Sequence, residues 1–518
     1  MRPSTYLAGP FVLLLGAIVF ACGGNGSNRS GFGADASSSS GGSGSSGGDD
    51  NGEGGCGLLC GTGSDGSMGP GPCQGLQCAA ATCSGQDTTL TGHVYDPAGN
   101  LPLYNVYVYI PNTTPQPITA GNPECNACEA PASGGPIIGR STGPDGSFSI
   151  VKGSMDDWGV PAGNNNGKGI PLVIQVGKWR KQLVIPSVTP CAINDLDMVF
   201  NTGTGTAKQL RLPAKGSEGD MPLIAFTSGC DPAECFLRHV GIDDSEFAPP
   251  GTAGKHVHFY TANSGSSIAG GNTVANTYQW WTDSANLLKY DIVFNACECT
   301  PFGRGPTAYG AMDVYLKGGG RLFTTHYYGN WFIPDTGTAD LESVASWNSN
   351  DKTLAGWSSG PANEDSEADM VDQTFPKGQA FATWLQDNSI STSLGNITLA
   401  DLRDDIAAPA PAGCSQSSGT CLSTRWIYNP SDQHPRYLSF NTPVGEPAAM
   451  QCGRAVYSDV HLSGSSDGSA FPAECNDPDI DSPPGHAINE KALEFLFFDL
   501  SSCVQNDSAP PPPPPPVQ

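Results

Sequence analysis

Apolar and polar residues alternate along residues 88–200, which is typical of half-buried β-strands. The alternating stretches 90–94 and 106–110 flank a turn at 96–100, and this arrangement predicts a β-hairpin. Further strand patterns lie at 147–150, 172–176 and 182–185. Since Gly- and Pro-rich turns separate them and helical spacing is lacking, we predict an all-β sandwich over residues 87–205.

After residue 220 the pattern changes to continuous apolar strands that alternate with helical spacing. Strand patterns lie at 223–227, 257–260, 291–295, 321–326, 437–440 and 455–457, and helical patterns at 308–316, 379–387, 399–406 and 489–500. Such an alternation indicates an α/β layer with a mostly parallel sheet. We therefore predict a multidomain chain, in which the β-sandwich is followed by a flavodoxin-like α/β domain over 218–504 with an insertion between 326 and 437.

The N-terminus has the features of an export leader, residues 1–21. Arg2 precedes an apolar stretch at 7–20, and the stretch ends at the sequence VFAC, residues 19–22. This junction resembles the lipobox of bacterial lipoproteins, which implies cleavage before Cys22 and diacylation of that cysteine. An ordinary cleaved signal peptide is the alternative, whereas an uncleaved anchor would need roughly 20 apolar residues. Because Gly23 stands where an inner-membrane retention signal would have Asp, we expect lipid anchoring at the outer membrane or cell surface.

Two segments are predicted to lack a packed core. Residues 22–86 are rich in Gly and Ser and poor in large apolar residues, so we expect a disordered, lipidated linker. Residues 505–518 end in a proline run, which predicts an extended tail.

Charge and cysteine content limit the environment and the partners. The 518 residues include 50 acidic and 24 basic side chains, and the resulting net charge of −26 argues against nucleic acid as a partner. Eighteen cysteines in an exported chain predict a disulfide framework in an oxidising compartment. Candidate disulfide cysteines of the second domain are Cys230, Cys235, Cys297, Cys299, Cys414 and Cys421, with connectivity left open by their spacing.

The predicted sandwich carries one family resemblance. The segments LTGHVYD at 90–96 and TGPDGSF at 142–148 resemble the G-x-V-x-D and T-x-x-D-G-x-F patterns of carboxypeptidase regulatory-like (transthyretin-like) domains. The zinc motif of the metallocarboxypeptidases does not accompany these patterns. The resemblance therefore implies a structural or binding role.

The second domain resembles another superfamily. The segments that carry this resemblance are Tyr-Asp-Ile-Val-Phe at 290–294, YLKGGGRLF at 315–323 followed by His326, and Gly-Arg-Ala-Val-Tyr at 453–457 followed by His461. They are similar to the class I glutamine amidotransferase-like superfamily and, within it, to the trehalose-utilisation (ThuA-like) branch. Val460 stands where that branch has the Gly of a Gly-His pair. The resemblance implies a flavodoxin-like fold and points to carbohydrate as a ligand class.

Candidate chemistry gathers at the predicted strand ends, where open α/β sheets bind ligands. His326 and His461 are the candidate acid and base groups. An amidotransferase relative would use a cysteine nucleophile, which implies Cys297 or Cys299 activated by one of these histidines. The competing interpretation, which we favour, places both cysteines in disulfides with the cysteines at 230 and 235, because exported neighbouring thiols oxidise.

A zinc site is a third interpretation of the same region. It would use the four clustered cysteines, or His256 and His258 on one face of a strand. The cysteines lack the C-x₂-C spacing, and the two histidines lack an identified third ligand. We therefore expect no metal and no cofactor.

Aromatic residues near the strand ends are candidate ligand-binding residues. Trp280, Trp281, Tyr327, Tyr328 and Trp331 form two such clusters. Aromatic rings can stack on sugars, and ordinary core packing is the alternative. The acidic segments 363–369 and 477–481 offer oxygen ligands for calcium, although neither has the order of an EF-hand, so solvated loops are expected.

These observations favour a lipid-anchored, disulfide-stabilised surface protein that binds an extracellular ligand, carbohydrate or protein, through its second domain. The membrane would be a partner only through the lipid. The alternative is an exported hydrolase or related enzyme on sugar-derived substrates, with His326 and His461 as acid and base. The distance between these histidines discriminates the two hypotheses.

Overall fold

The computed structural model describes residues 72–510 apart from several gaps. These gaps are 126–131, 154–156, 230, 263–264, 270–274, 299, 301, 335–336, 349–363, 463–468 and 477–484, and the side chains at 275–277, 364–366 and 485–486 are likewise excluded. The predicted leader, Cys22, most of the linker, Cys230, Cys299, the acidic segment 477–481 and residues 511–518 lie outside the described residues.

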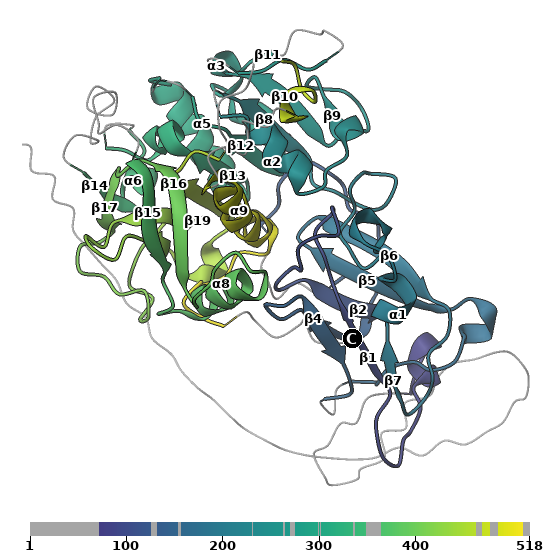
Figure 1. Ribbon diagram of the computed structural model, residues 1–518. Helices are drawn as coiled ribbons and strands as arrows, with labels where there is room; N and C mark the ends of the chain where they lie inside the picture. The colour runs from purple at the N-terminus through teal and green to yellow at the C-terminus, as the bar shows by residue number, and fades with distance from the viewer. Residues whose placement is uncertain are drawn as a thin grey trace, which may run out of the picture. The chain divides into compact units, whose positions relative to one another are not determined.

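The first half of the described chain forms two small sheets around a shared core (Figure 1). One has the order β4-β1-β7, from β1 (Thr89–His93), β4 (Ser147–Ile150) and β7 (Ile193–Asp195). The other has the order β3-β2-β5-β6, from β2 (Tyr107–Pro111), β3 (Pro136–Ser141), β5 (Ile170–Val176) and β6 (Trp179–Ile185). Leu90 and Ile150 of the first sheet share one apolar cluster with Val108 and Ile174 of the second.

The predicted hairpin between β1 and β2 is wrong. Both strands are present, but β1 pairs with β4 and β7, whereas β2 pairs with β3 and β5. Tyr95 forms a local bridge to Pro102, after which the chain enters the other sheet. Alternation identifies a strand, but its partner depends on contacts distant in sequence.

The second half contains a large mixed sheet, with 11 strands among the described residues. Its strand order is β11-β10-β8-β12-β13-β20-β19-β18-β15-β16, with β9 beside β10. The strands from β11 to β20 are parallel: β8 (Ile224–Ser228), β9 (Phe247–Ala248), β10 (Val257–Thr261), β11 (Ala275–Asn276), β12 (Ile292–Asn295), β13 (Arg321–Thr325) and β20 (Gly453–Ser458). The protein is therefore a multi-sheet α/β fold.

The insertion extends the same sheet with antiparallel strands. These are β15 (Glu364–Val371), β16 (Asn396–Leu402), β18 (Thr424–Tyr428) and β19 (Pro435–Thr442), while β14 (Ala345–Trp347) and β17 (Ile406–Pro409) form a separate pair. Two predictions are corrected here. Residues 399–402 belong to strand β16 and residue 406 begins β17, so the predicted helix at 399–406 is absent, and the acidic segment 363–369 is largely strand β15 instead of a solvated loop.

An arginine of the same sheet balances part of the acidic charge of β15. Arg436 on β19 lies 2.5 Å from a carboxylate oxygen of Glu367 and 3.4 Å from one of Asp369. Burial still raises the pKa of Asp369 to about 7, and Arg436 opposes that rise.

Helices cover both faces of the large sheet (Figure 1). The helices of this half are α2 (Ala233–His239), α3 (Thr277–Trp280), α4 (Ser284–Leu287), α5 (Pro306–Lys317), α6 (Ala339–Glu342), α8 (Pro376–Asp387) and α9 (Gly485–Ser501), whereas α1 (Asp197–Phe200) contacts β1 in the first half. Alternate residues of each strand face opposite cores, as in β12, where Ile292 and Phe294 join α2 and α9 while Val293 joins α5.

The predicted helices at 308–316, 379–387 and 489–500 are confirmed by α5, α8 and α9. Proline occupies the first turn of both α5 and α8, where the missing N–H costs nothing. Gly318 follows α5 and ends it before β13. Among the described residues, no helix combines the length and the apolar composition that crossing a bilayer requires.

Disulfides close local loops and also connect distant parts of the described chain. They join Cys73 to Cys78, Cys83 to Cys191, Cys125 to Cys452, Cys235 to Cys475 and Cys414 to Cys421. Such a set indicates an oxidising compartment.

Candidate functional site

The site lies where the order of the parallel strands reverses. From β8 the chain passes to β10 on one side of it and then to β12 on the other side. At such a switch point the loops after adjacent strands diverge, and their side chains face a shared crevice at the carboxyl ends. The ends of β8, β12, β13 and β20 supply the residues described next.

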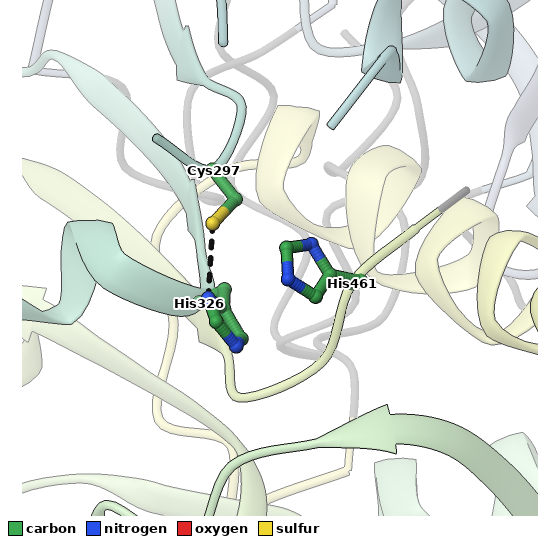
Figure 2. A group of neighbouring side chains, drawn as sticks. All are labelled: Cys297, His326 and His461. Carbon is green, nitrogen blue, oxygen red and sulfur yellow. Dashed lines mark hydrogen bonds between the residues drawn. The ribbon is translucent and has the colours of Figure 1, made fainter. Parts of the chain in front are cut away.

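A thiol and an imidazole form the centre of the site (Figure 2). Cys297 follows β12, and its Sγ lies 2.9 Å from Nδ1 of His326, which directly follows β13. Both side chains are fully buried. Cys297 is therefore hydrogen-bonded to an imidazole that could accept its proton.

The backbone of His326 is strained. Its φ of 46° lies in the left-handed region, which costs a non-glycine residue free energy. The hydroxyl of Tyr457 donates to the His326 carbonyl and helps to hold this conformation. The strained turn directs the ring back toward Cys297.

His461 completes the group. Its ring centroid lies 3.9 Å from that of His326, with an angle of 31° between the planes. The side chain is 16% exposed, which makes it the most accessible of the three. Figure 2 shows its ring turned toward Cys297 and His326. The sequence hypothesis that the two histidines meet in one site agrees with this geometry.

Asp231, which follows β8, lies close to His461. Its Oδ2 is 3.8 Å from Nδ1 of His461 and accepts the backbone N–H of Leu462. The carboxylate is almost fully buried. Asp231 is thus placed to orient the imidazole of His461, a role that the sequence analysis missed.

A pair of buried carboxyl groups, Asp405 and Asp459, lies behind the site. Asp459 and Asp405 share contacts with the Tyr457 hydroxyl, at 2.8 and 3.2 Å. Burial and the neighbouring Asp405 raise the pKa of Asp459 well above its ordinary value. Arg403 pairs with Asp405 at 2.9 Å and so balances part of this buried charge.

The expectation that Cys297 belongs to a disulfide is corrected, because the structure holds it as a thiol. Cys235 on α2, a predicted partner, instead bonds to Cys475. Cys414 is joined to Cys421. The disulfide assumption came from closeness in sequence, whereas Cys297 is turned toward His326 by the end of β12.

The aromatic candidates divide into buried and accessible residues. Trp281, Tyr328 and Trp331 are fully buried around the guanidinium of Arg304, with ring centroids 4.4–5.1 Å from it. Arg304 in turn pairs with buried Glu298. These rings therefore pack in the core and present no face to a sugar.

The other two aromatic candidates differ. Trp280 is nearly buried and stacks on Tyr260, with ring centroids 4.3 Å apart. Tyr327 is partly exposed and lies edge-on to His326 at 4.5 Å. Tyr327 is thus the aromatic candidate that borders the site.

The His-x-His pair at the start of β10, His256 just before it and His258 within it, does not form a joint site. Nδ1 of His256 lies 2.7 Å from Glu246, and Nδ1 of His258 lies 2.9 Å from the Tyr290 hydroxyl. Within the described residues, the donor atoms of Cys297, His326 and His461 instead lie within 4.8 Å of one another. The sequence signal for the group of Cys297, His326 and His461 is that each residue follows the end of a parallel strand.

Comparisons with known proteins give only distant similarity. No protein-family model matches the chain, and no curated protein matches it. A solved ThuA-like protein from Bacteroides uniformis is 9% identical, with a TM-score of 0.28, over 56% of this chain and 94% of its own. A cytoplasmic protein from Salmonella typhimurium is 10% identical, with a TM-score of 0.29, over 55% of this chain and 99% of its own. At these values the similarity assigns no activity.

Proposed function

We propose that this protein is an exported, lipid-anchored hydrolase that uses Cys297 as nucleophile and His326 as its base. The observation that carries the proposal is the 2.9 Å contact between Sγ and Nδ1 at a strand-order reversal, with His461 beside it. The proposed substrates are esters or amides of sugar-derived compounds, a class taken from the ThuA-like resemblance of the sequence.

The proposed architecture is a β-sandwich followed by a flavodoxin-like domain. The parallel strands β10-β8-β12-β13-β20, numbered by their order in the chain, follow the sequence 2-1-3-4-5. This is the flavodoxin-like order, which supports the interpretation. The two small sheets with a shared core support the sandwich.

The proposed reaction proceeds in two steps. His326 takes the thiol proton, and the Cys297 thiolate attacks the acyl carbon and forms a thioester as the leaving group departs with that proton. Water then attacks the thioester, loses its proton to a site histidine, and releases the acid and the thiol. His461, oriented by Asp231, is the second proton-transfer group.

A binding function is the second candidate, and burial favours it. Cys297 and His326 are fully buried, whereas His461 is 16% exposed, so among these three residues only His461 offers a surface to a ligand. In this case the site would bind a ligand at His461 and Tyr327 without turnover.

The test uses the mature full-length protein in detergent. It measures hydrolysis of p-nitrophenyl acetate and acetylated sugars, and labelling by iodoacetamide. We expect Cys297→Ala and His326→Asn to lower hydrolysis at least about 100-fold, because the nucleophile or its base is lost. His256→Asn, whose ring contacts Glu246 outside the site, is the matched control. Unchanged hydrolysis in a folded Cys297→Ala protein would refute the proposal.

A further inference from the structure

We propose that Cys297, His326 and His461 also bind one borderline or soft transition-metal ion, Zn²⁺ or Cu⁺, and that the bound ion blocks catalysis. The binding step stands on the donor geometry alone, and the inhibition rests on the proposed hydrolase function.

The donor set fits such an ion in kind, and small side-chain movements of about 1 Å would bring its spacing to that of a bound ion. One sulfur and two imidazole nitrogens lie within 4.8 Å of one another. In a tetrahedral zinc site, metal–ligand bonds of about 2.0–2.3 Å place neighbouring donors about 3.4–3.6 Å apart. The 2.9 Å contact between Sγ and Nδ1 would therefore lengthen by less than about 1 Å on binding.

The chemistry of these donors selects the ion. Thiolate and imidazole favour Zn²⁺ and Cu⁺, whereas Ca²⁺ and Mg²⁺ favour oxygen ligands. Three protein ligands leave a fourth position for water. Asp231 adds a buried carboxylate next to His461, the kind of group that orients metal-binding histidines.

The other candidate groups among the described residues are less suitable. Asp404, Asp432 and His434 lie close together, but Arg436 already contacts Asp404 at 3.1 Å and would repel a cation. In the group of Cys235, Glu474 and Cys475 both sulfurs are consumed by a disulfide.

Metal binding has a direct consequence for the thiol. Zn²⁺ displaces the thiol proton to solvent and occupies the sulfur lone pair that would attack an acyl carbon, with no change in oxidation state. The same bond protects the thiol from oxidation in an exported protein. The ion is therefore a reversible inhibitor and a protecting group.

The experiment titrates metal-depleted, full-length mature protein with Co²⁺ and then displaces it with Zn²⁺. We expect a thiolate-to-cobalt charge-transfer band and one ion per chain. Cys297→Ala should abolish the band, and His461→Ala should weaken binding at least about 10-fold. His256→Ala should bind as wild type does, and thermal unfolding of each variant verifies its fold.

Two results would overturn the metal site: no charge-transfer band in the wild type, or equal Co²⁺ affinity in wild type and Cys297→Ala. A parallel hydrolysis assay separates the two proposals. Zn²⁺ should suppress turnover and a chelator should restore it. If metal binds at Cys297 but the metal-free protein does not hydrolyse the substrates, the metal site is supported and the hydrolase is refuted. If the protein hydrolyses the substrates but binds no metal, the hydrolase is supported and the metal site is refuted.

Discussion

At the residue scale, the protein buries carboxyl groups away from the site as well as within it. Asp96, in the turn after β1, shares a hydrogen bond with Glu494 on α9, and both are almost fully buried. Burial raises the pKa of Asp96 to about 6, while backbone N–H groups such as that of Asn100 oppose the rise. Burial and the neighbouring Asp96 raise the pKa of Glu494 well above its ordinary value. Protonation of the Asp96–Glu494 pair therefore stabilises the folded protein.

This pair predicts that stability falls as pH rises. The native protein keeps the Asp96 proton up to about pH 6, whereas the unfolded chain loses it near pH 4. Native protein thus binds more protons between these values, and the free energy of unfolding decreases across that window by roughly 2–3 kcal/mol. Urea unfolding at pH 4.5 and 7.5 measures the change.

Asp96→Asn should reduce this pH dependence, because an amide can keep both hydrogen bonds without ionising. The matched control is Asp387→Asn at the exposed end of α8. An identical pH dependence in Asp96→Asn and wild type would contradict the assignment.

At the scale of elements, the edge strand β16 shows how pattern and context combine. Its residues Ile397, Leu399 and Leu402 are buried, while Asn396 and Thr398 are exposed. The side chain of Asn489 on α9 accepts from the N–H of Ala400 and donates to its carbonyl. The helix thereby satisfies backbone hydrogen-bonding groups of an edge strand that could otherwise pair with another strand.

Leu399→Ala should destabilise the protein by about 2–5 kcal/mol, because it removes a fully buried side chain from the core under α9. Denaturant unfolding provides the measurement. Thr398→Ala, on the exposed face of the same strand, should change stability by about 0.5 kcal/mol or less. Equal effects of the two substitutions would show that β16 does not pack as described.

At the scale of the whole molecule, cross-links hold segments that are distant in sequence. The Cys125–Cys452 disulfide joins residues 327 positions apart and connects the segment after β2 to the turn before β20. Nearby, Lys178 pairs with Asp291 at 2.6 Å, and Asp291 also accepts the N–H of Gly121. One apolar cluster includes residues from both halves of the described chain.

Removing this cross-link should cost far more than removing a local one. Loop-closure entropy over 327 positions predicts about 6 kcal/mol for the pair Cys125→Ser and Cys452→Ser. The pair Cys414→Ser and Cys421→Ser, only seven positions apart, should cost about 2 kcal/mol. Thermal unfolding of both double variants tests the difference, and equal melting temperatures would contradict it.

Much of the element content follows from the sequence because periodicity is local. Helix α5 was predictable from its apolar spacing between Pro306 and Gly318, and β12 from its continuous apolar run. The prediction of a helix at 399–406 failed because a short apolar run fits both the helical and the strand periodicity. In the folded protein, contacts with α9 favour the strand β16 at this place.

The alternation of strands and helices can be predicted from the chain alone, as can the acidic charge and the strand-end positions of His326 and His461. Strand pairing, the Cys235–Cys475 bond and the contact of the Cys297 thiol with His326 follow only from the folded arrangement. The physical reason is that apolar periodicity is fixed by neighbouring residues. The partner of a strand or a sulfur depends instead on which distant segments the folded sheet brings within bonding distance.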